Sequence, residues 1–351
     1  MSETVIILGA GASRLAGAPL MNDFLDVADA IRKNSGAKDE DFERVFIAKD
    51  ALQAVHSKAQ MDLLNLESVF AAFEMAKLLG RLGSLPINET DSLPNSMRRL
   101  IYKTLQATVK FPVRNERIYP PRPYDELAKA LAAIWSANSV RALKTSFITF
   151  NYDVCLDYAL AFQGLPIDYS LGPFKGSGFK VLKLHGSLNW SQCEKCKGIV
   201  PLAVGLYVNS SRFVLLDLKE ITFDFSRGLA GLKCCNENLK PDPFIAPPTW
   251  NKTQYHSQLA GVWRAAAQEL SGAENIIVCG YSLPETDQFF RYLYALGSVG
   301  GANLKRFWVI DRDSRVVGRF KDLCGPQASA RFQFLEEPFD QAIPEIAGIL
   351  K

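Results

Sequence analysis

The chain has 351 residues, which at roughly 150 residues per domain suggests two domains or one domain enlarged by insertions. Hydrophobic residues make up 48% and charged residues 22%, so the chain can bury a sizeable core, and global disorder and a collagen-like repeat are excluded. The 40 Lys and Arg residues barely exceed the 37 Asp and Glu residues, and a net charge of +3 is too small to indicate a DNA-binding or membrane-binding protein.

The sequence shows the pattern of neither a membrane helix nor a signal peptide. No apolar run approaches the roughly 18 residues that a membrane helix needs. The first residues lack the basic start and the long apolar stretch of a signal peptide. Seven cysteines in such a chain are not typical of a disulfide framework. We therefore expect a cytoplasmic protein.

Short apolar runs, rich in β-branched and aromatic residues, alternate with helical patterns along the chain. The runs predict buried parallel strands at residues 5–8, 147–150, 181–184, 276–279, 307–310 and 332–335. Helical periodicity lies between them, for instance at residues 125–137 and 257–270. This alternation predicts an α/β fold with a Rossmann-like, doubly wound parallel sheet, whose ligands bind beyond the carboxyl ends of the strands.

Two insertions interrupt this pattern. Residues 25–115 show only helical periodicity and predict an inserted helical module, in which Asn65 can cap a helix whose apolar face is marked by Leu66, Val69, Phe70, Phe73 and Leu78. Residues 190–245 predict a small cysteine-rich, zinc-type module. The Rossmann-like domain would then consist of residues 1–24, 116–189 and 246–351.

A locally basic stretch precedes a proline-rich segment at residues 119–123, which predicts a stiff linker. Its members are Arg98, Arg99, Lys103, Lys110, Arg114 and Arg117. Because the total charge is near zero, a solvated helix face is favoured over a nucleic-acid surface.

A turn of small residues follows the first strand: Gly9, Ala10, Gly11, Ala12 and Ser13. Such a turn lets the backbone approach a pyrophosphate, whose charge the N–H groups of the next helix stabilise. As a dinucleotide fingerprint the turn is incomplete, because Arg14 stands where the third glycine would be. A tight strand-to-helix turn without a ligand is the alternative.

Polar and ionisable side chains close the next two strands. Asn151 and Asp153 can face one crevice, where Asn bonds ribose hydroxyls or a water and Asp stabilises positive charge. Capping of the next helix is their alternative role. His185 ends the third strand beside a glycine, where an imidazole can accept a proton at neutral pH. A structural histidine is the alternative, and we assign that role to His56 and His256.

The ends of the fourth and fifth strands also carry residues suited to a ligand. Gly280 and Ser282 follow the fourth strand and can bind phosphate or ribose, and Asp311 ends the fifth, where an acid can accept hydrogen bonds from ribose hydroxyls. Each signal is weak alone. Small, polar or ionisable residues at four consecutive strand ends are much harder to dismiss.

Four cysteines cluster in the second insertion: Cys193, Cys196, Cys234 and Cys235. Two thiolate pairs predict a tetrahedral zinc site. The first pair has the spacing of a zinc knuckle, whereas the second pair is adjacent and lacks the usual two-residue turn. A reduced, metal-free cluster or a redox pair is the alternative. Cys155, Cys279 and Cys324 are isolated and predicted to be small buried hydrophobes.

Taken in chain order, these motifs resemble the sirtuin signature. The resemblance covers the sheet-bearing segments and the cysteine cluster but not residues 25–115. It implies a Rossmann-like domain that binds NAD and cleaves its nicotinamide–ribose bond. By this resemblance, residues 9–13 would hold the pyrophosphate, and Asn151 and Asp153 the nicotinamide and its ribose. His185 would be the catalytic base.

The resemblance also implies that Gly280 and Ser282 line the dinucleotide site, while Asp311 stands where sirtuins often have Asn. Two departures concern the activity. Deacetylases follow the glycine turn with Pro-Asp-Phe-Arg, but residues 19–22 here read Pro-Leu-Met-Asn. They also carry a Phe-Gly-Glu strand in the peptide groove, where residues 246–250 here read Ala-Pro-Pro-Thr-Trp. The acetyl-lysine groove is therefore in doubt.

The Pro-Pro-Thr-Trp stretch, the helical insertion and the segment from Ser282 to Asp287 resemble bacterial sirtuin-like proteins that hydrolyse NAD, often in anti-phage defence. The leading hypothesis is therefore an NAD glycohydrolase that forms nicotinamide and ADP-ribose. An NAD-dependent protein deacylase and a non-catalytic module that senses NAD or ADP-ribose are the alternatives. We expect a homo-oligomer with a structural zinc ion, a protein partner that triggers activity, and no membrane or direct nucleic-acid binding.

Overall fold

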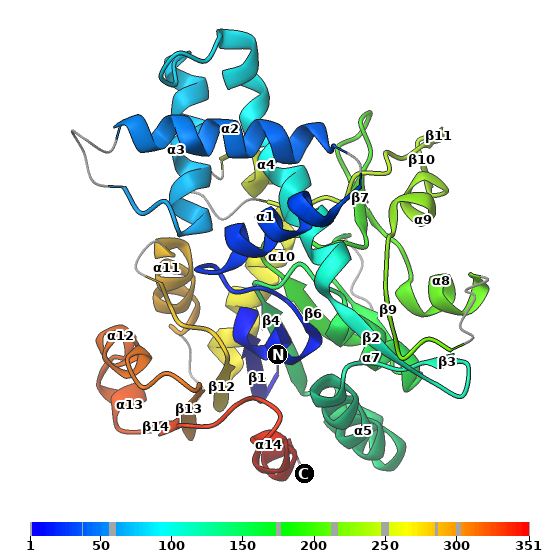
Figure 1. The fold of residues 1–351 in the computed structure, drawn as a ribbon. Coiled ribbons are helices and arrows are strands. Elements are labelled where there is room, and N and C mark those ends of the chain that lie inside the picture. The colour runs from blue at the N-terminus through cyan, green and yellow to red at the C-terminus, as the bar shows by residue number, and fades with distance from the viewer. Residues whose placement is uncertain are drawn as a thin grey trace.

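A seven-stranded parallel sheet forms the centre of the molecule (Figure 1). The structure, a computed structural model, describes residues 2–36, 38–55, 61–172, 177–211, 217–246, 253–284, 287–299 and 303–350. The strands lie in the order β14-β13-β12-β1-β4-β6-β5. Their bounds are Thr4–Leu8 for β1, Thr145–Thr149 for β4, Ile167–Asp168 for β5, Phe179–Lys183 for β6, Asn275–Cys279 for β12, Arg306–Ile310 for β13 and Phe332–Leu335 for β14.

The six strands expected from the sequence are confirmed, with ends that differ by a residue or two. The runs of β1, β4 and β12 are buried on both sides of the sheet, which is why they read as continuous apolar stretches. At β14, the strand at the edge of the sheet, burial was overestimated, because its residues are half-buried or exposed. The seventh strand, β5, was not expected. It contains only two residues at the edge of the sheet, too few to leave an apolar pattern in the sequence.

Helices cover both faces of the sheet, as the doubly wound fold predicts. On β1, Ile6 and Leu8 belong to one apolar core, while Val5 and Ile7 belong to the other, because successive side chains point to opposite faces. The first core contains α5 (Arg122–Ala137), α7 (Cys155–Phe162) and α14 (Ile343–Leu350). The second contains α10 (Thr253–Gly272), α11 (Gln288–Gly297) and α12 (Val316–Leu323).

The strand order reverses at one place in the sheet. From β1 the chain moves outward to β4 and β6, and it then returns to the other side of β1 to add β12, β13 and β14. The crossover connections on the two sides of β1 therefore run in opposite directions. In open α/β sheets such a switch point leaves a crevice beyond the carboxyl ends of the strands, and ligands bind there. The β1–β12 junction is thus the expected binding position.

The first insertion consists mainly of four helices: α1 (Phe24–Asn34), α2 (Glu40–Val55), α3 (Leu66–Leu79) and α4 (Ile87–Thr108). Asn65 caps α3 as expected, accepting from the N–H groups of Glu67 and Ser68. The predicted face of α3 is buried except at Leu78, whose exposed fraction is 72%. Leu78 lies five residues after Phe73, a spacing that turns it off the buried face.

The end of this insertion is not helical. Lys110–Arg114 form β2, which pairs antiparallel with β3 (Arg117–Ile118) and with β9 (Glu220–Thr222) from the second insertion. The expectation of purely helical structure up to residue 115 was wrong there. The proline-rich segment is also more than a linker, because Pro121 is the N-cap of α5 and Pro123 lies in its first turn.

Gly17, just before the insertion, packs so closely on Thr108 at the end of α4 that an added Cβ would lie 2.3 Å from the Thr108 carbonyl oxygen.

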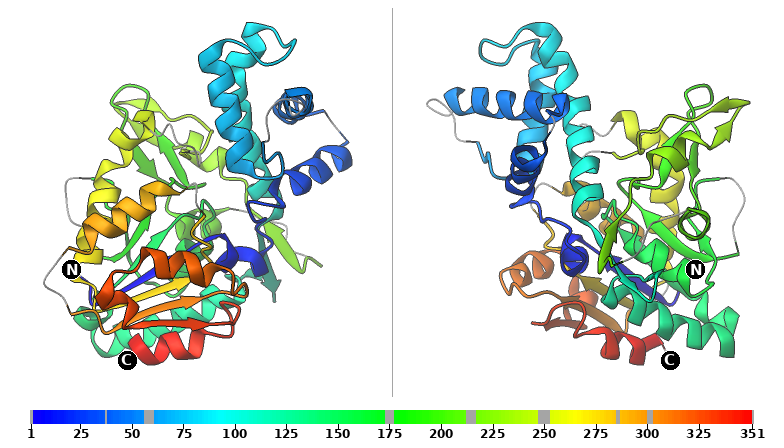
Figure 2. Two further views of the ribbon diagram at one scale, coloured as in Figure 1. Left: turned by 90° about the vertical axis from the view of Figure 1, so that its left-hand side faces the viewer. Right: turned by 45° about the vertical axis from the view of Figure 1, so that its right-hand side comes forward.

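The second insertion is built of short elements. They are β7 (Trp190–Gln192), β8 (Ile199–Pro201), α8 (Val204–Ser210), β9, α9 (Ser226–Ala230), β10 (Lys233–Cys234) and β11 (Glu237–Asn238). Figure 2, in its right-hand view, shows both insertions rising beside each other above the sheet. The division of the chain into separately folding units at residues 24, 115, 189 and 245 stays a prediction.

The turn after β12 generates a first testable prediction. Gly280 has φ +60°, and a Cβ there would lie 2.3 Å from the Ala12 nitrogen. We expect Gly280→Ala to lower the free energy of unfolding by about 1–3 kcal/mol or more, because strain and a backbone clash add. Urea denaturation measures this loss. Gly318, which lies in α12 with open space around it, is the matched control, and Gly318→Ala should be neutral or stabilise by up to about 1 kcal/mol. Equal effects of the two changes would contradict the expectation.

Candidate functional site

Two glycine turns interlock at the switch point. The N–H of Gly11 donates to the carbonyl oxygen of Gly280 (2.9 Å), and the N–H of Gly9 donates to Cys279 (3.0 Å). A Cβ at Gly9 would lie 2.5 Å from the Gly280 oxygen, and one at Gly11 would lie 2.8 Å from the Gly280 Cα. The glycines therefore let the turns after β1 and β12 touch each other, which supports the tight-turn interpretation of this motif. Binding of a pyrophosphate by the same turn stays a prediction.

The segment after Gly9 is a 3₁₀ helix, Ala10–Ala16, of seven residues. Within the turn, the N–H of Ala12 donates to the Gly9 carbonyl (3.0 Å). Arg14, which replaces a third glycine, points to Asp23 and pairs with it at 2.6 Å. The short helix and these internal bonds leave fewer backbone donors for a pyrophosphate than the long α-helix of a typical dinucleotide fold.

Asn151 is the polar side chain that joins this turn to β4. Its Nδ2 donates to the Gly9 carbonyl oxygen (2.8 Å) and to Ser13 Oγ (3.1 Å). A carbonyl oxygen can only accept, so the amide nitrogen must face the turn, and Oδ1 is left as an acceptor. Ser13 Oγ lies 2.7 Å from the hydroxyl of Tyr124, whose pKa burial raises well above its ordinary value, so that it stays protonated.

Asp153 is buried, and one of its carboxylate oxygens accepts from the N–H of Cys155 (3.0 Å) at the start of α7. Asp153 thus bonds the first N–H group of α7, although the N-cap residue itself is Val154 and no side chain caps the helix there. Burial is the main cause of the raised pKa of the Tyr124 hydroxyl, and the negative charge of Asp153 raises that pKa further.

His185 follows β6, the neighbour of β4, so it lies at the same edge of the sheet as Asn151. Its exposed fraction is 4%. The imidazole contacts Phe150 (ring centroids 5.4 Å apart) and Tyr152 (6.0 Å). His185 thus adjoins Phe150 and Tyr152, whereas Asn151, which lies between them in the chain, bonds the glycine turn.

The last residue of the second insertion and the first residue after it hold the backbone around His185. The N–H of Ala246 donates to the His185 carbonyl oxygen (2.7 Å), and Gly186 forms a bridge with Ile245. A Cβ at Gly186 would lie 2.3 Å from the Phe244 oxygen, so only glycine permits this contact. The Pro-Pro-Thr-Trp motif, Thr286 and His56 lie outside the described residues, and so does the side chain of His256.

A buried polar network beneath the edge was not expected from the sequence. Lys183 and Asp157, each 1% exposed, form an ion pair at 2.9 Å, and Lys183 Nζ also donates to the Asp153 carbonyl (2.5 Å). Tyr169 donates to Asp157 (2.6 Å), and Asn189 bonds Tyr169 (3.3 Å). The network fixes the backbone that carries Asn151 and Asp153. In the sequence, the one feature that could have indicated this network is Lys183, a charged residue at the end of an apolar strand.

The turn after β12 presents an aromatic side chain to the edge. Tyr281 stacks on Phe150 (centroids 4.2 Å apart) and donates to Asp287 (2.6 Å). Ser282 is exposed, and its carbonyl accepts from Arg319 (3.0 Å). At the end of β13, Asp311 accepts from the N–H of Asp313 (2.9 Å), and partial burial raises the pKa of its carboxyl group. Sequence patterns did not single out Tyr281.

The four clustered cysteines converge on one point. Their ligand atoms all lie within 4.8 Å of one another, and Cys234 Sγ lies 3.6 Å from Cys196 Sγ and 3.9 Å from Cys235 Sγ. Four thiolates about 2.3 Å from a zinc ion stand about 3.8 Å apart at the corners of a tetrahedron, so these spacings fit the metal. No pair among these cysteines forms a disulfide.

Local turns explain how both pairs reach this point. Cys193 and Cys196 lie in the turn between β7 and β8, where the N–H of Gly198 donates to Cys196 Sγ (3.4 Å) and lowers the pKa of that thiol to about 7. Cys234 ends β10, and Cys235 and Asn236 form a two-residue turn with φ of 53° and 65°. Positive φ at Cys235 lets adjacent cysteines supply two ligands without the usual knuckle.

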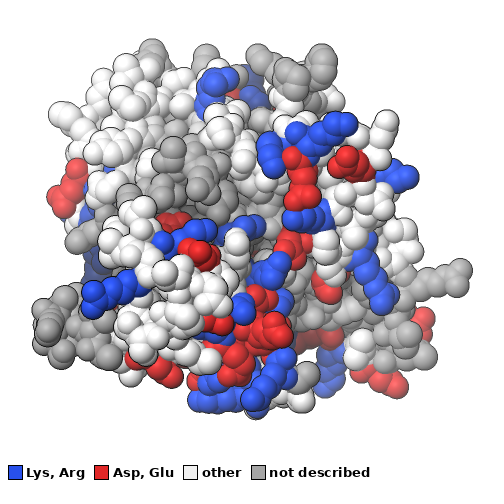
Figure 3. Space-filling model, turned by 90° about the horizontal axis from the view of Figure 1, so that it is seen from above, with Lys and Arg blue, Asp and Glu red and all other residues white. Residues whose placement is uncertain are grey.

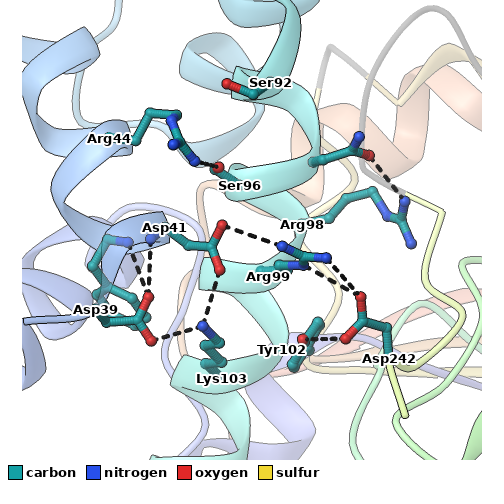
Figure 4. A network of polar contacts seen from close by, with 12 residues as sticks. Asp39, Asp41, Arg44, Ser92, Ser96, Arg98, Arg99, Tyr102, Lys103 and Asp242 are labelled. Carbon is teal, nitrogen blue, oxygen red and sulfur yellow. Dashed lines mark hydrogen bonds and ion pairs between the residues drawn. The ribbon is translucent and has the colours of Figure 1, made fainter. Parts of the chain in front are cut away.

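The basic stretch is compensated by acidic residues. Lys103 pairs with Asp39 (2.7 Å) and Asp41 (3.0 Å), and Arg99 pairs with Asp242 (3.2 Å), as Figure 4 shows. In Figure 3 basic and acidic side chains alternate in a band right of centre. This mixture supports the solvated-face interpretation over a nucleic-acid surface. Within the described ranges, every helix is too short or too polar to cross a bilayer.

Comparisons with known proteins found distant structural likeness only. No family model matches the sequence, and the search of curated proteins likewise gave no match. A Sir2 homolog in complex with NAD is 15% identical, with a TM-score of 0.41 over 99% of this chain and 88% of that one. A Sir2 complex with a p53 peptide and NAD⁺ is 16% identical, with a TM-score of 0.41 over 99% of this chain and 92% of that one. The function is therefore argued from the site itself.

The cysteine cluster predicts a bound metal. We expect the purified protein to contain about one zinc ion per chain by elemental mass spectrometry, because four converging thiolates form a closed structural site. Cys235→Ser should lose most of the zinc and lower the melting temperature, since metal binding contributes folding free energy. Cys324→Ser, outside the cluster, should keep it. Full zinc content in Cys235→Ser would exclude a site with this ligand.

The buried ion pair beneath the edge gives a stability prediction. Lys183→Met leaves Asp157 buried without its cation and should lower the free energy of unfolding by about 3–5 kcal/mol. The double variant Lys183→Met/Asp157→Leu should recover most of this loss, because it removes both charges. Chemical denaturation of the three proteins measures both effects. An additive double variant would show that the pair does not act as a unit.

Proposed function

We propose that the protein hydrolyses NAD to nicotinamide and ADP-ribose at the carboxyl edge of its sheet. The observation that carries this proposal is the amide of Asn151, which bonds both the first glycine turn and Ser13 at the switch point. This interaction couples β4 to the place where an open α/β sheet binds a nucleotide. The resemblance of the ordered motifs to sirtuins supports NAD as the nucleotide.

The arrangement suits cleavage of a glycosidic bond with a good leaving group. Nicotinamide in NAD leaves as a neutral molecule and needs no general acid, so the barrier lies in forming an oxocarbenium-like ribosyl cation and delivering water to it. Asn151 Oδ1, the acceptor of an amide whose nitrogen is fixed by the glycine turn, would orient a ribose hydroxyl or the attacking water. This fixed geometry favours a positioning role for Asn151.

The two ionisable residues would act on charge and on a proton. Asp153 would stabilise developing positive charge through the oxygen that Cys155 does not use. His185 would accept a proton from a ribose hydroxyl or from water. Because its ring is nearly enclosed by Phe150 and Tyr152, the substrate would reach it along one edge. Ser13, Gly280, Ser282 and Asp311 would line the rest of the dinucleotide site.

The biological setting in the proposal is an NAD-depleting effector of anti-phage defence, restrained until a partner triggers it. The likeness of the motif set to bacterial sirtuin-like NAD hydrolases supports this setting. Self-association would fit the exposed apolar side chains of α11 and the residues after it, Tyr292, Leu296 and Val299. Self-association and NAD hydrolysis are tested together by measuring the activity of the assembled protein.

The decisive experiment is incubation of the purified, assembled protein with NAD, followed by chromatography of the products. We expect nicotinamide and ADP-ribose from the native protein, and a loss of at least about 100-fold in Asn151→Ala and in His185→Ala. Asn138→Ala, which removes an exposed helix cap of α6 (Ser139–Ala142), is the matched control and should keep the native rate.

Other outcomes separate the alternatives. NAD loss that requires an acyl-lysine peptide would replace the proposal with a protein deacylase. Tight binding of NAD or ADP-ribose without any product, in the assembled protein, would replace it with a nucleotide-sensing module. Native turnover in both Asn151→Ala and His185→Ala, with the fold intact, would reject the site.

A further inference from the structure

A buried tyrosine, Tyr124, reaches the first glycine turn from helix α5. It lies in the first turn of that helix, directly after Pro123, and its exposed fraction is 1%. Its ring packs edge-on against Phe339, with centroids 5.5 Å apart. Its hydroxyl lies 2.7 Å from Ser13 Oγ, a residue 111 positions earlier in the chain. Tyr124 therefore joins the helix layer to the turn that carries the candidate site.

Three hydrogen bonds in series connect this tyrosine to the end of β1. Ser13 Oγ accepts from Asn151 Nδ2 (3.1 Å), and the same nitrogen donates to the Gly9 carbonyl oxygen (2.8 Å). An amide nitrogen carries two hydrogens, so both donors of Asn151 are used. The Gly9 bond decides which end of the amide faces the turn. The Ser13 bond prevents rotation about the first bond, because it fixes a second direction in the amide plane.

Ser13 can hold this amide only while its own side chain is held. A serine has three staggered rotamers, and each places Oγ at a different point. The bond to the Tyr124 hydroxyl selects one of them. Burial, and after it the charge of Asp153, raises the pKa of Tyr124 well above its ordinary value, so the phenol keeps its proton at physiological pH. Tyr124 is thus a neutral and immobile partner for Ser13.

We propose that Tyr124 is a positioning residue of the candidate site, which holds the Asn151 amide through Ser13 and thereby fixes the direction of its Oδ1 acceptor. Because Tyr124 is enclosed, it acts on a ligand only through these two side chains. Its effect on turnover rests on the proposed function, whereas its effect on the Asn151 amide does not.

The test compares Tyr124→Phe with Tyr158→Phe. Each change removes one buried hydroxyl and its hydrogen bond, since the Tyr158 hydroxyl donates to the Ile118 carbonyl oxygen (2.8 Å). Both tyrosines belong to the same apolar core, so the two variants should lose similar amounts of melting temperature. Of the two tyrosines, Tyr124 alone bonds Ser13. The comparison therefore separates positioning from packing.

The first readout is the side-chain amide of Asn151 in the NMR spectrum of the full chain with isotope-labelled asparagine. Its signal is identified by its absence from Asn151→Asp. Tyr124→Phe should shift this signal and speed the exchange of its hydrogens with solvent by at least about 10-fold, because the bond to Ser13 is loosened. Tyr158→Phe should leave both unchanged. An unaltered Asn151 signal in Tyr124→Phe would overturn the proposal.

A variant at the other end of the link makes the test independent of any one substitution. Ser13→Ala removes the acceptor itself and should speed exchange at the Asn151 amide at least as much as Tyr124→Phe. Adding Tyr124→Phe to Ser13→Ala should then have no further effect on this exchange, because the tyrosine acts through the serine. Additive effects would overturn the proposed route.

The second readout is NAD hydrolysis by the assembled protein. We expect Tyr124→Phe to lower kcat by at least about 10-fold and to change KM by less than about 2-fold, because a displaced amide weakens the transition state more than the binding of a whole dinucleotide. Tyr158→Phe should keep the native constants. Equal losses in the two variants would overturn the positioning role. If the native protein does not hydrolyse NAD, the proposed function fails, and the Asn151 signal alone decides the role of Tyr124.

Discussion

The close approach of two backbone turns at the β1–β12 junction is the constraint on which the site depends. Gly9 and Gly11 lie against Gly280 at distances that leave no space for a side chain, and the Gly11 N–H bonds the Gly280 carbonyl directly. Because the turns touch, the Gly9 carbonyl lies within reach of Asn151 on the other neighbour of β1. Three strands, from sequence positions far apart, are thereby tied together at one edge.

The same edge is supported from beneath and from the side. The Lys183–Asp157 pair holds the backbone at Asp153, and the backbone at His185 accepts from the N–H of Ala246, the first residue after the cysteine-rich insertion. The side chains of the candidate site are thus supported by residues that lie far apart in the chain. A change far from the edge can therefore alter the site, because interactions that share a network do not act independently.

Much of the fold could be predicted from the sequence because buried parallel strands leave continuous apolar runs, and β1, β4 and β12 each left one. Local chemistry was equally readable at Asn65, whose side chain caps α3. The edge strand β5 and the β2–β3–β9 sheet could not be predicted, since two- and three-residue strands carry no periodicity and β2 pairs with a strand over 100 residues away. Leu78 was misassigned because apolar residues at helix ends need not follow the buried face.

The candidate site was predictable only in part. Residue type and strand end placed Asn151 and His185 at one edge, but nothing in the sequence showed that alternate residues of 150–153 turn to different neighbours. The polar network escaped prediction because Asp157, Tyr169 and Asn189 are brought to Lys183 by tertiary packing alone. For Cys234 and Cys235, the missing information was the positive φ of a tight turn, which spacing rules do not encode.

The contact between Gly17 and Thr108 also determines how well the chain would tolerate a change in the length of its first insertion. The first insertion leaves the sheet layer and returns to it at almost the same point, so its two ends lie together and the residues between them form a closed loop. Lengthening such a loop costs little conformational entropy, because the closure term grows only with the logarithm of its length. Residues could therefore be added at the tip of this insertion without changing the register of the strands in the central sheet.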